Sequence, residues 1–345
     1  MGIIGRHSFE LCSRPRIISS ASYVGDKEGK GPLRECFDKI CRDDTLGLDS
    51  WEQAESRMFE SAVRAALAKI KRQSDDLSCL LGGDLLNQII SSGFAAREIR
   101  APFIGLYGAC STISEGLMLG GMLVDGGFAE LAACAASSHF SAAERQFRYP
   151  LEMGVQAVPS SQRTVTGAGS IIIQVAGEFR PGAGNVFEHV ALTGGTIGSV
   201  EDFGITDANN MGAAMAPAAF KTIKTHLSDY SRRVEDYDRI ITGDLGIFGS
   251  DMLYELLRGE GIEIADRHED CGKLMFSPEQ NVNCGASGCG CAATVMSSWF
   301  LPKIESGEIR RVLFLATGAL MSPVSSLQGE SIPSIAHAVV IEHID

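Results

Sequence analysis

Short apolar segments that end in glycine alternate with helical segments along this chain, and this alternation restricts the fold more than any other feature. Trp51–Lys71 carries apolar residues at the spacing of one buried helical face, which predicts a helix. Apolar strands are predicted at Leu77–Leu81, Phe103–Tyr107 and Glu130–Ala135, with helical segments between them that end near Arg97 and Val124. Because strands that alternate with helices pair in parallel, the pattern indicates an α/β fold.

The second half of the chain repeats this order. Gly243-Asp244-Leu245 follows an apolar strand at Arg239–Ile241, as Gly83-Asp84-Leu85 follows the first strand. A helix that opens in the glycine-rich segment 284–291 and runs to about residue 304 precedes a further strand at Arg311–Ala316. Strand-glycine-helix units occur in any α/β protein, but four elements in the same order favour an internal duplication.

The clearest linker in the sequence is Gly177–Asn185, which contains Pro181 and three glycines. We therefore expect two duplicated halves, residues 1–180 and residues 181–345. Two halves rich in βαβ units would place their matching loops around a shared cleft at the strand ends. The functional site is expected in that cleft.

The composition excludes several classes of function. The 345 residues include 30 basic and 43 acidic ones, a net charge of −13, whereas nucleic-acid binding requires clustered Lys and Arg. With 45% hydrophobic and 21% charged residues, the chain can bury a large core. The sequence contains no secretion signal and no apolar run of about 18 residues, so we expect a cytoplasmic-type soluble protein whose ten cysteines are reduced.

Cys110 is the residue best placed for chemistry. It follows the strand that ends at Tyr107 and opens the helix that ends near Val124, so its sulfur and Ser111 lie at a helix N-terminus. Exposed N–H groups there favour an anion or a thiolate, and the tight turn resembles a nucleophile elbow. The alternative is a small buried cysteine that fills space between helix and sheet.

Gly-Ala-Cys-Ser-Thr at 108–112, the duplicated halves and the glycine-rich second-half segment resemble the thiolase and ketoacyl-synthase superfamily. From about Ser8 to His343, the chain is similar in particular to the stage V sporulation protein AD family. This similarity is carried by the strings Gly83–Gln88, Ser137–His139, Ala143–Pro150, Gly204–Asp207, Met215–Ala219, Thr242–Leu245 and Ala316–Leu320. The resemblance implies a thiolase-like five-layer αβαβα fold, usually dimeric.

The same resemblance implies a role in moving dipicolinic acid into the developing bacterial spore. It also implies membrane-embedded sporulation proteins as partners. On this ground we expect a homodimer and a peripheral location at the forespore or spore inner membrane.

The chain departs from the pattern of a condensing enzyme at two positions. Carbon–carbon bond formation in the superfamily needs the cysteine plus His with Asn, or two His, to polarise the acyl carbonyl and hold the oxyanion. These positions align here with Asp244 and with Gly285–Ser287, and neither supplies an imidazole. A carboxylate beside a thiol raises its pKa, so we expect a catalytically inactive homologue. The alternatives are a ketoacyl-synthase-like acyltransferase with Cys110 as nucleophile, and a scaffold that binds only membrane partners.

Dipicolinate is a flat ring with two carboxylates, so its pocket needs N–H or cationic donors at the ends and apolar walls between them. We expect ligand contacts from Cys110, Ser111, Ser137, Ser138, His139, Asp244, Ser287 and His337. Ser137, Ser138 and His139 are included because they follow the next parallel strand and so reach the same sheet edge. His337 has a hydrogen-bonded core role as its alternative. Because Asp244 suits a dianion only with a proton or a bridging calcium, the ligand is either the free acid or its calcium chelate.

Arg145 and Arg148 could also bind a carboxylate, with ion pairs to Glu144 or Glu152 as the alternative. The five His and Cys residues between positions 268 and 291 lack the paired spacing of a zinc site. Accordingly, we predict no metal site and no cofactor.

Overall fold

The computed structural model describes residues 2–147, 158–180 and 184–345. The strands are β1 (Gly2–Ile4), β2 (Ser8–Glu10), β3 (Arg16–Gly25), β4 (Lys39–Cys41), β5 (Cys79–Gly83), β6 (Phe103–Gly105), β7 (Leu131–Ser138), β8 (Arg163–Thr164), β9 (Gly167–Gln174), β10 (Val190–Thr196), β11 (Arg239–Thr242), β12 (His268–Asp270), β13 (Ala286–Ser287), β14 (Arg311–Ala319) and β15 (Ser334–His343). The helices are α1 (Trp51–Lys69), α2 (Ile90–Ile99), α3 (Thr112–Asp125), α4 (Phe140–Phe147), α5 (Met211–Asp229), α6 (Gly246–Arg258), α7 (Cys271–Met275), α8 (Cys289–Val295), α9 (Leu301–Glu305) and α10 (Pro323–Leu327).

Two blocks of five strands have the same topology. The first runs β3-β9-β7-β5-β6 and the second runs β10-β15-β14-β11-β12. When the strands of each block are numbered by their order in the sequence, the order across the sheet is first, fifth, fourth, second and third in both blocks. A single antiparallel pair, Arg16 with Ala191, joins the two blocks. The predicted α/β fold built from two duplicated halves is therefore confirmed, whereas the division at residue 180 stays a prediction and Pro181 lies outside the described residues.

Each block is a mixed sheet. β5 is parallel to β6 and β7, and β11 is parallel to β12 and β14, as the alternation of strands and helices predicts. β9 and β15, however, run antiparallel to β7 and β14. β9 and β15 therefore each lie next to a parallel strand but run in the opposite direction.

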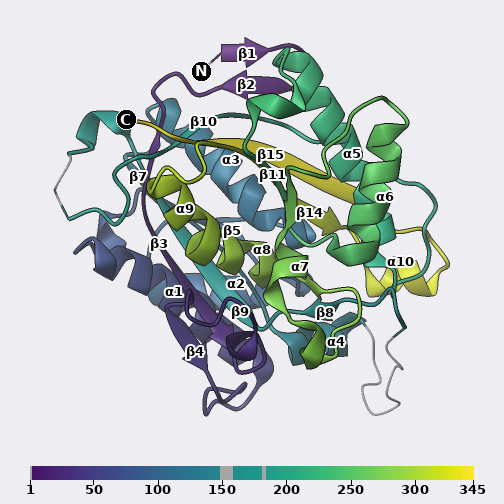
Figure 1. Ribbon diagram of the computed structural model, residues 1–345. Helices are drawn as coiled ribbons and strands as arrows, with labels where there is room; N and C mark the ends of the chain where they lie inside the picture. Colours follow the sequence, from purple (N-terminus) through teal and green to yellow (C-terminus); the bar gives the residue numbers. More distant parts are fainter. Residues whose placement is uncertain (1, 148–157, 181–183) are drawn as a thin grey trace.

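Helices form three layers around the two sheet blocks. α1 packs on β3, β7 and β9, while α5 packs on β10, β14 and β15. Between the sheets, α3 contacts both β7 and β14, and α8 contacts β7 and β9. Figure 1 shows α1 on one side of the molecule and α5 with α6 on the other, with α3 and α8 between them. The order is the predicted αβαβα arrangement.

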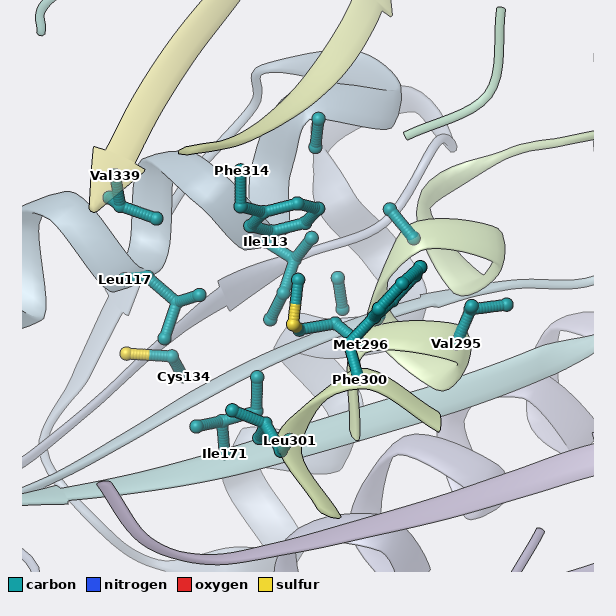
Figure 2. Close-up of a cluster of buried hydrophobic side chains, with 14 of the residues drawn as sticks. Ile113, Leu117, Cys134, Ile171, Val295, Met296, Phe300, Leu301, Phe314 and Val339 are labelled. Atoms are coloured by element: carbon teal, nitrogen blue, oxygen red, sulfur yellow. The ribbon is translucent and has the colours of Figure 1, made fainter. Parts of the chain in front are cut away.

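The central layer is the largest part of the core. Figure 2 shows Ile113 and Leu117 of α3 close to Cys134 and Ile171 of the first sheet and Phe314 of the second. Small residues allow this packing, because a Cβ at position 120 would lie 2.8 Å from the sulfur of Cys134. Burial of α3 between two sheets fixes its N-terminus, and with it Cys110, at the centre of the molecule.

The helix predicted to run to about residue 304 is interrupted. α8 gives way to a π-helical segment, Met296–Phe300, before α9 begins at Leu301. Pro302 in the first turn of α9 has no N–H to donate, which accounts for the change in hydrogen bonding at this point. Within the described parts of the chain, no helix combines the length and apolarity needed to span a membrane.

The close contact between α8 and β9 gives a test of the packing. A Cβ added at Gly169 would lie 2.4 Å from the backbone of Ala293, whereas one added at Gly177 would have no atom within 4 Å. Gly169→Ala should lower the free energy of unfolding by about 1–3 kcal/mol through overpacking. Urea denaturation measures this change, and Gly177→Ala is the matched control. Equal stability of the two variants would contradict the described packing of α8.

Candidate functional site

A strained turn presents Cys110 between the two sheets. After β6, the chain forms the 3₁₀ turn Ala109–Ser111, in which Ala109 has a φ of 50°, in the left-handed region. The Ser111 hydroxyl donates to the carbonyl of Gly108 at 2.6 Å and closes the turn. On the other side, Gly318 of β14 approaches so closely that its Cβ would lie 2.1 Å from the Gly108 oxygen. A strand of the second half thus supports the turn that holds Cys110.

The second half brings Asp244 and Ser287 to this sulfur. Cys110 Sγ lies 3.8 Å from the hydroxyl oxygen of Ser287, which donates to Asp244 Oδ2 at 2.8 Å. The N–H of Gly288 donates to the same oxygen at 2.9 Å, and the Thr317 hydroxyl donates to Oδ1 at 2.9 Å. The aligned loops of the two halves therefore meet at one point, with a carboxyl group beside a thiol.

Burial sets the protonation of this pair. Burial raises the pKa of the Cys110 thiol well above 9.0, and the negative charge of Asp244 adds to the effect. The contact with the Ser287 hydroxyl opposes the shift without cancelling it. Burial also raises the pKa of Asp244 to about 6, against the hydrogen bonds it accepts. At neutral pH the sulfur is therefore a protonated thiol beside a mostly ionised carboxyl group.

A cavity of about 550 Å³, including its open part, lies in front of the thiol. Its lining is mostly apolar and comprises Leu85, Tyr107, Ala109, Cys110, Ala143, Glu144, Phe147, Gln162, Thr164, Met211, Met215, Ser287, Ala319 and Met321. Of the residues predicted to bind ligand, only Cys110 and Ser287 line it, and Asp244 lies behind Ser287.

Gln162 is a cavity residue that the sequence reasoning missed. Its side-chain amide donates to the carbonyls of Asp244 at 2.6 Å and Ala286 at 2.9 Å. Its Oε1 is buried and has no hydrogen-bond partner among the described residues. Because Gln162 belongs to a short connection with no periodic pattern, no signal in the sequence could have identified it.

Ser137, Ser138 and His139 do not line the cavity, which corrects the inference that they do. The Ser137 hydroxyl donates to Glu55 at 3.0 Å, and the Ser138 hydroxyl donates to the carbonyl of Val165 at 2.6 Å. His139 Nε2 bonds the carbonyl of Asp44 at 2.7 Å, and burial lowers its pKa. Hydrogen bonds to nearby protein groups occupy these side chains, because they lie in the packed interior at the end of β7.

Two further predicted contacts also lie outside the cavity lining. The Ser111 hydroxyl is used to close its own turn. His337 Nδ1 accepts from the N–H of Gly198 at 3.2 Å, and burial lowers the pKa of His337 to about 4. This environment matches the alternative of a hydrogen-bonded core histidine.

Arg145 follows its structural alternative, with a different partner. It forms an ion pair with Glu52 and stacks 5.4 Å above the ring of Trp51. Arg148 and Glu152 lie outside the described residues. In the described ranges, no group of three or more His, Cys, Asp or Glu side chains is arranged to hold a metal ion.

Comparison with solved structures identifies the class of fold. The chain is similar to 3-oxoacyl-[acyl-carrier-protein] synthase III from Aquifex aeolicus, with a TM-score of 0.55 and 12% identity over 95% of this chain and all of that one. Human mitochondrial 3-ketoacyl-CoA thiolase gives a TM-score of 0.57 and 11% identity over 98% of this chain and all of that one. The fold is therefore of the thiolase type, with a cysteine at the head of its central helix.

Comparison of sequences is more specific. The chain is 43% identical to stage V sporulation protein AD of Bacillus subtilis over 344 residues, which cover 99% of this chain and 98% of that protein. The profile of the stage V sporulation protein AD family matches residues 5–342. The chain belongs to this family.

The protonated state of Cys110 can be tested by alkylation. Because burial and Asp244 raise the pKa of this thiol, iodoacetamide at pH 8 should label the exposed Cys12 at least about tenfold faster than Cys110. Peptide mass spectrometry over a time course measures both rates in one sample, with Cys12 as the internal control. Labelling of Cys110 at the rate of Cys12 or faster would contradict the assigned protonation.

Proposed function

We propose that this protein binds dipicolinate in the Cys110 cavity during sporulation and does not catalyse acyl transfer. Membership of the stage V sporulation protein AD family supports the role in sporulation. The chemistry of the cavity supports the division between binding and catalysis. Homodimer formation, membrane-embedded partners and a peripheral location at the spore inner membrane are parts of the same proposal and rest on the family likeness.

The position of Asp244 beside Cys110 is the observation that carries the proposal. A condensing enzyme needs a thiolate and donors directed at a developing oxyanion. Here a carboxyl group and the Ser287 hydroxyl occupy that place, and Ser287 already donates to the carboxyl group. The described lining of the cavity contains no imidazole. These features disfavour nucleophilic attack while leaving a chamber next to the thiol.

The walls of the cavity suit a flat ring. Tyr107, Phe147 and three methionines supply apolar surface, and methionine side chains adapt to the shape of a ligand. Protonation of Asp244 would reduce the repulsion of a bound dianion, and the pKa of about 6 makes this proton available at little cost near neutral pH. The apolar walls would hold the ring while polar groups at the rim hold its carboxylates.

Calorimetric titration tests ligand binding. We expect the protein to bind dipicolinate with a dissociation constant below 1 mM, an order-of-magnitude limit. Cys110→Leu should weaken binding at least about tenfold because the larger side chain fills the chamber. Cys12→Leu, which makes the same change at an exposed site, is the control. No heat at millimolar ligand would reject the proposal and favour a scaffold that binds only partner proteins.

Incubation with acyl-CoA tests the acyltransferase alternative. Because the thiol is protonated and lacks an imidazole partner, intact-protein mass spectrometry should show no acyl adduct after an hour with excess acetyl-CoA or decanoyl-CoA. A Cys110→Ala variant identifies any labelling at other cysteines. Rapid stoichiometric acylation that disappears in this variant would establish the enzymatic alternative.

A further inference from the structure

The Cys110 cavity has no cationic group to hold a dianion. Its described lining includes no Lys, Arg or His, while it includes Glu144 and adjoins Asp244. A dicarboxylate placed wholly inside this cavity would meet negative charge without compensation. The groups that bind the ligand's carboxylates must therefore be sought next to the cavity.

A second hollow of about 590 Å³, including its open part, adjoins the first, and the two share Glu144 and Gln162 in their linings. The second hollow is polar: it is lined by Lys27, Phe140, Glu144, Ser161, Gln162, Arg163, Asn209, Asn281, Val282 and Asn283. It thus places two cations beside a chamber that has none.

Arg163 is held in a fixed orientation with unused hydrogen-bonding capacity. Its guanidinium carbon lies 3.6 Å from the centre of the Phe140 ring, a contact that covers one face of the group. Its Nε is buried and has no hydrogen-bond partner among the described residues. A planar guanidinium fixed in this way presents its N–H groups edge-on, the geometry that a carboxylate accepts.

Lys27 lies close enough to Arg163 for repulsion. Burial lowers the pKa of Lys27, and the positive charge of Arg163 lowers it further. Among the ion pairs of the described residues, none includes Lys27 or Arg163. Two cations that repel each other in a partly buried hollow favour an anion between them.

Two carboxyl groups lie near the cations of this hollow and affect the pKa of Arg163. Glu28 and Glu144 both interact electrostatically with Arg163, and their charge opposes the burial that lowers its pKa. Glu28 is 1% exposed, its Oε1 accepts from the N–H of Thr166 at 3.2 Å, and burial raises its pKa. These carboxyl groups partly offset the effect of burial on the pKa of Arg163, but they leave its buried Nε without an acceptor.

We propose that Lys27 and Arg163 form the carboxylate-binding part of the ligand site, with both carboxylates of a small dicarboxylate in the polar hollow, one facing each cation, and the apolar edge of the ring directed past Gln162 into the Cys110 cavity. This inference rests on the proposed function, since it assigns the cations that hold the same ligand. The pair selects dicarboxylates over monocarboxylates. Gln162 lines both hollows and therefore lies at the passage between them.

Paired titrations with dipicolinate and pyridine-2-carboxylate test this assignment. The two probes share a ring and differ by one carboxylate. Lys27→Met and Arg163→Gln should each weaken dipicolinate binding at least about tenfold, while affinity for the monocarboxylate changes less than about twofold. Arg163→Lys should restore part of the affinity. Lys224→Met and Arg258→Gln, which remove the same charges at exposed ion pairs, are the controls.

The outcomes separate the two proposals. If the wild-type protein binds dipicolinate and both variants bind it equally well, the assignment of Lys27 and Arg163 is wrong and the proposed function stands. If a variant loses the same affinity for both probes, the assignment of Lys27 and Arg163 is also overturned, because general damage to the cavity would explain that result. If the wild-type protein binds neither probe, both proposals fail. Circular dichroism verifies that each variant is folded.

Discussion

The buried carboxyl group of Asp244 determines how the centre of the molecule is arranged. Its oxygens accept hydrogen bonds from Ser287, Gly288 and Thr317, which belong to two separate parts of the second half. Its backbone carbonyl accepts a further bond from Gln162. Because a buried carboxyl group is costly unless its hydrogen bonds are satisfied, these segments are held together at one point. Burial keeps the neighbouring Cys110 protonated, and the negative charge of the same carboxyl group adds to that effect.

The fold and the chemistry of this site depend on different residues. Small residues in α3 and along β7 and β9 allow two sheets to close on one helix, and that packing is shared with proteins only 11–12% identical to this chain. The charge at the head of the helix is set by a few side chains of the second half, Asp244 and Ser287 among them. The thiolase-type core therefore does not by itself determine the chemistry at the head of this helix.

The sequence identified the centre of the site because its residues follow matched strands. Asp244 comes after β11 and Ser287 precedes α8, so the duplication alone brings them to Cys110. The placement of Ser137–His139 failed, since the end of a strand indicates an edge of the sheet without indicating which groups fill the space there. Lys27 and Arg163 come from irregular connections or a two-residue strand, where no periodic pattern exists to interpret. For the same reason the antiparallel return of β9, rich in glycine and isoleucine, could not be inferred from alternation.

The contact of Gly318 with the turn at Gly108 has a consequence for how the protein matures during synthesis. The turn carrying the cysteine is supported by a strand that leaves the ribosome some two hundred residues later. A chain that ends before β14 would lack Ala319 and Met321 of the cavity lining as well as the support of this turn. Recognition of a small molecule at this place would thus report that the polypeptide is complete, and the bound molecule would fasten together segments distant in the sequence.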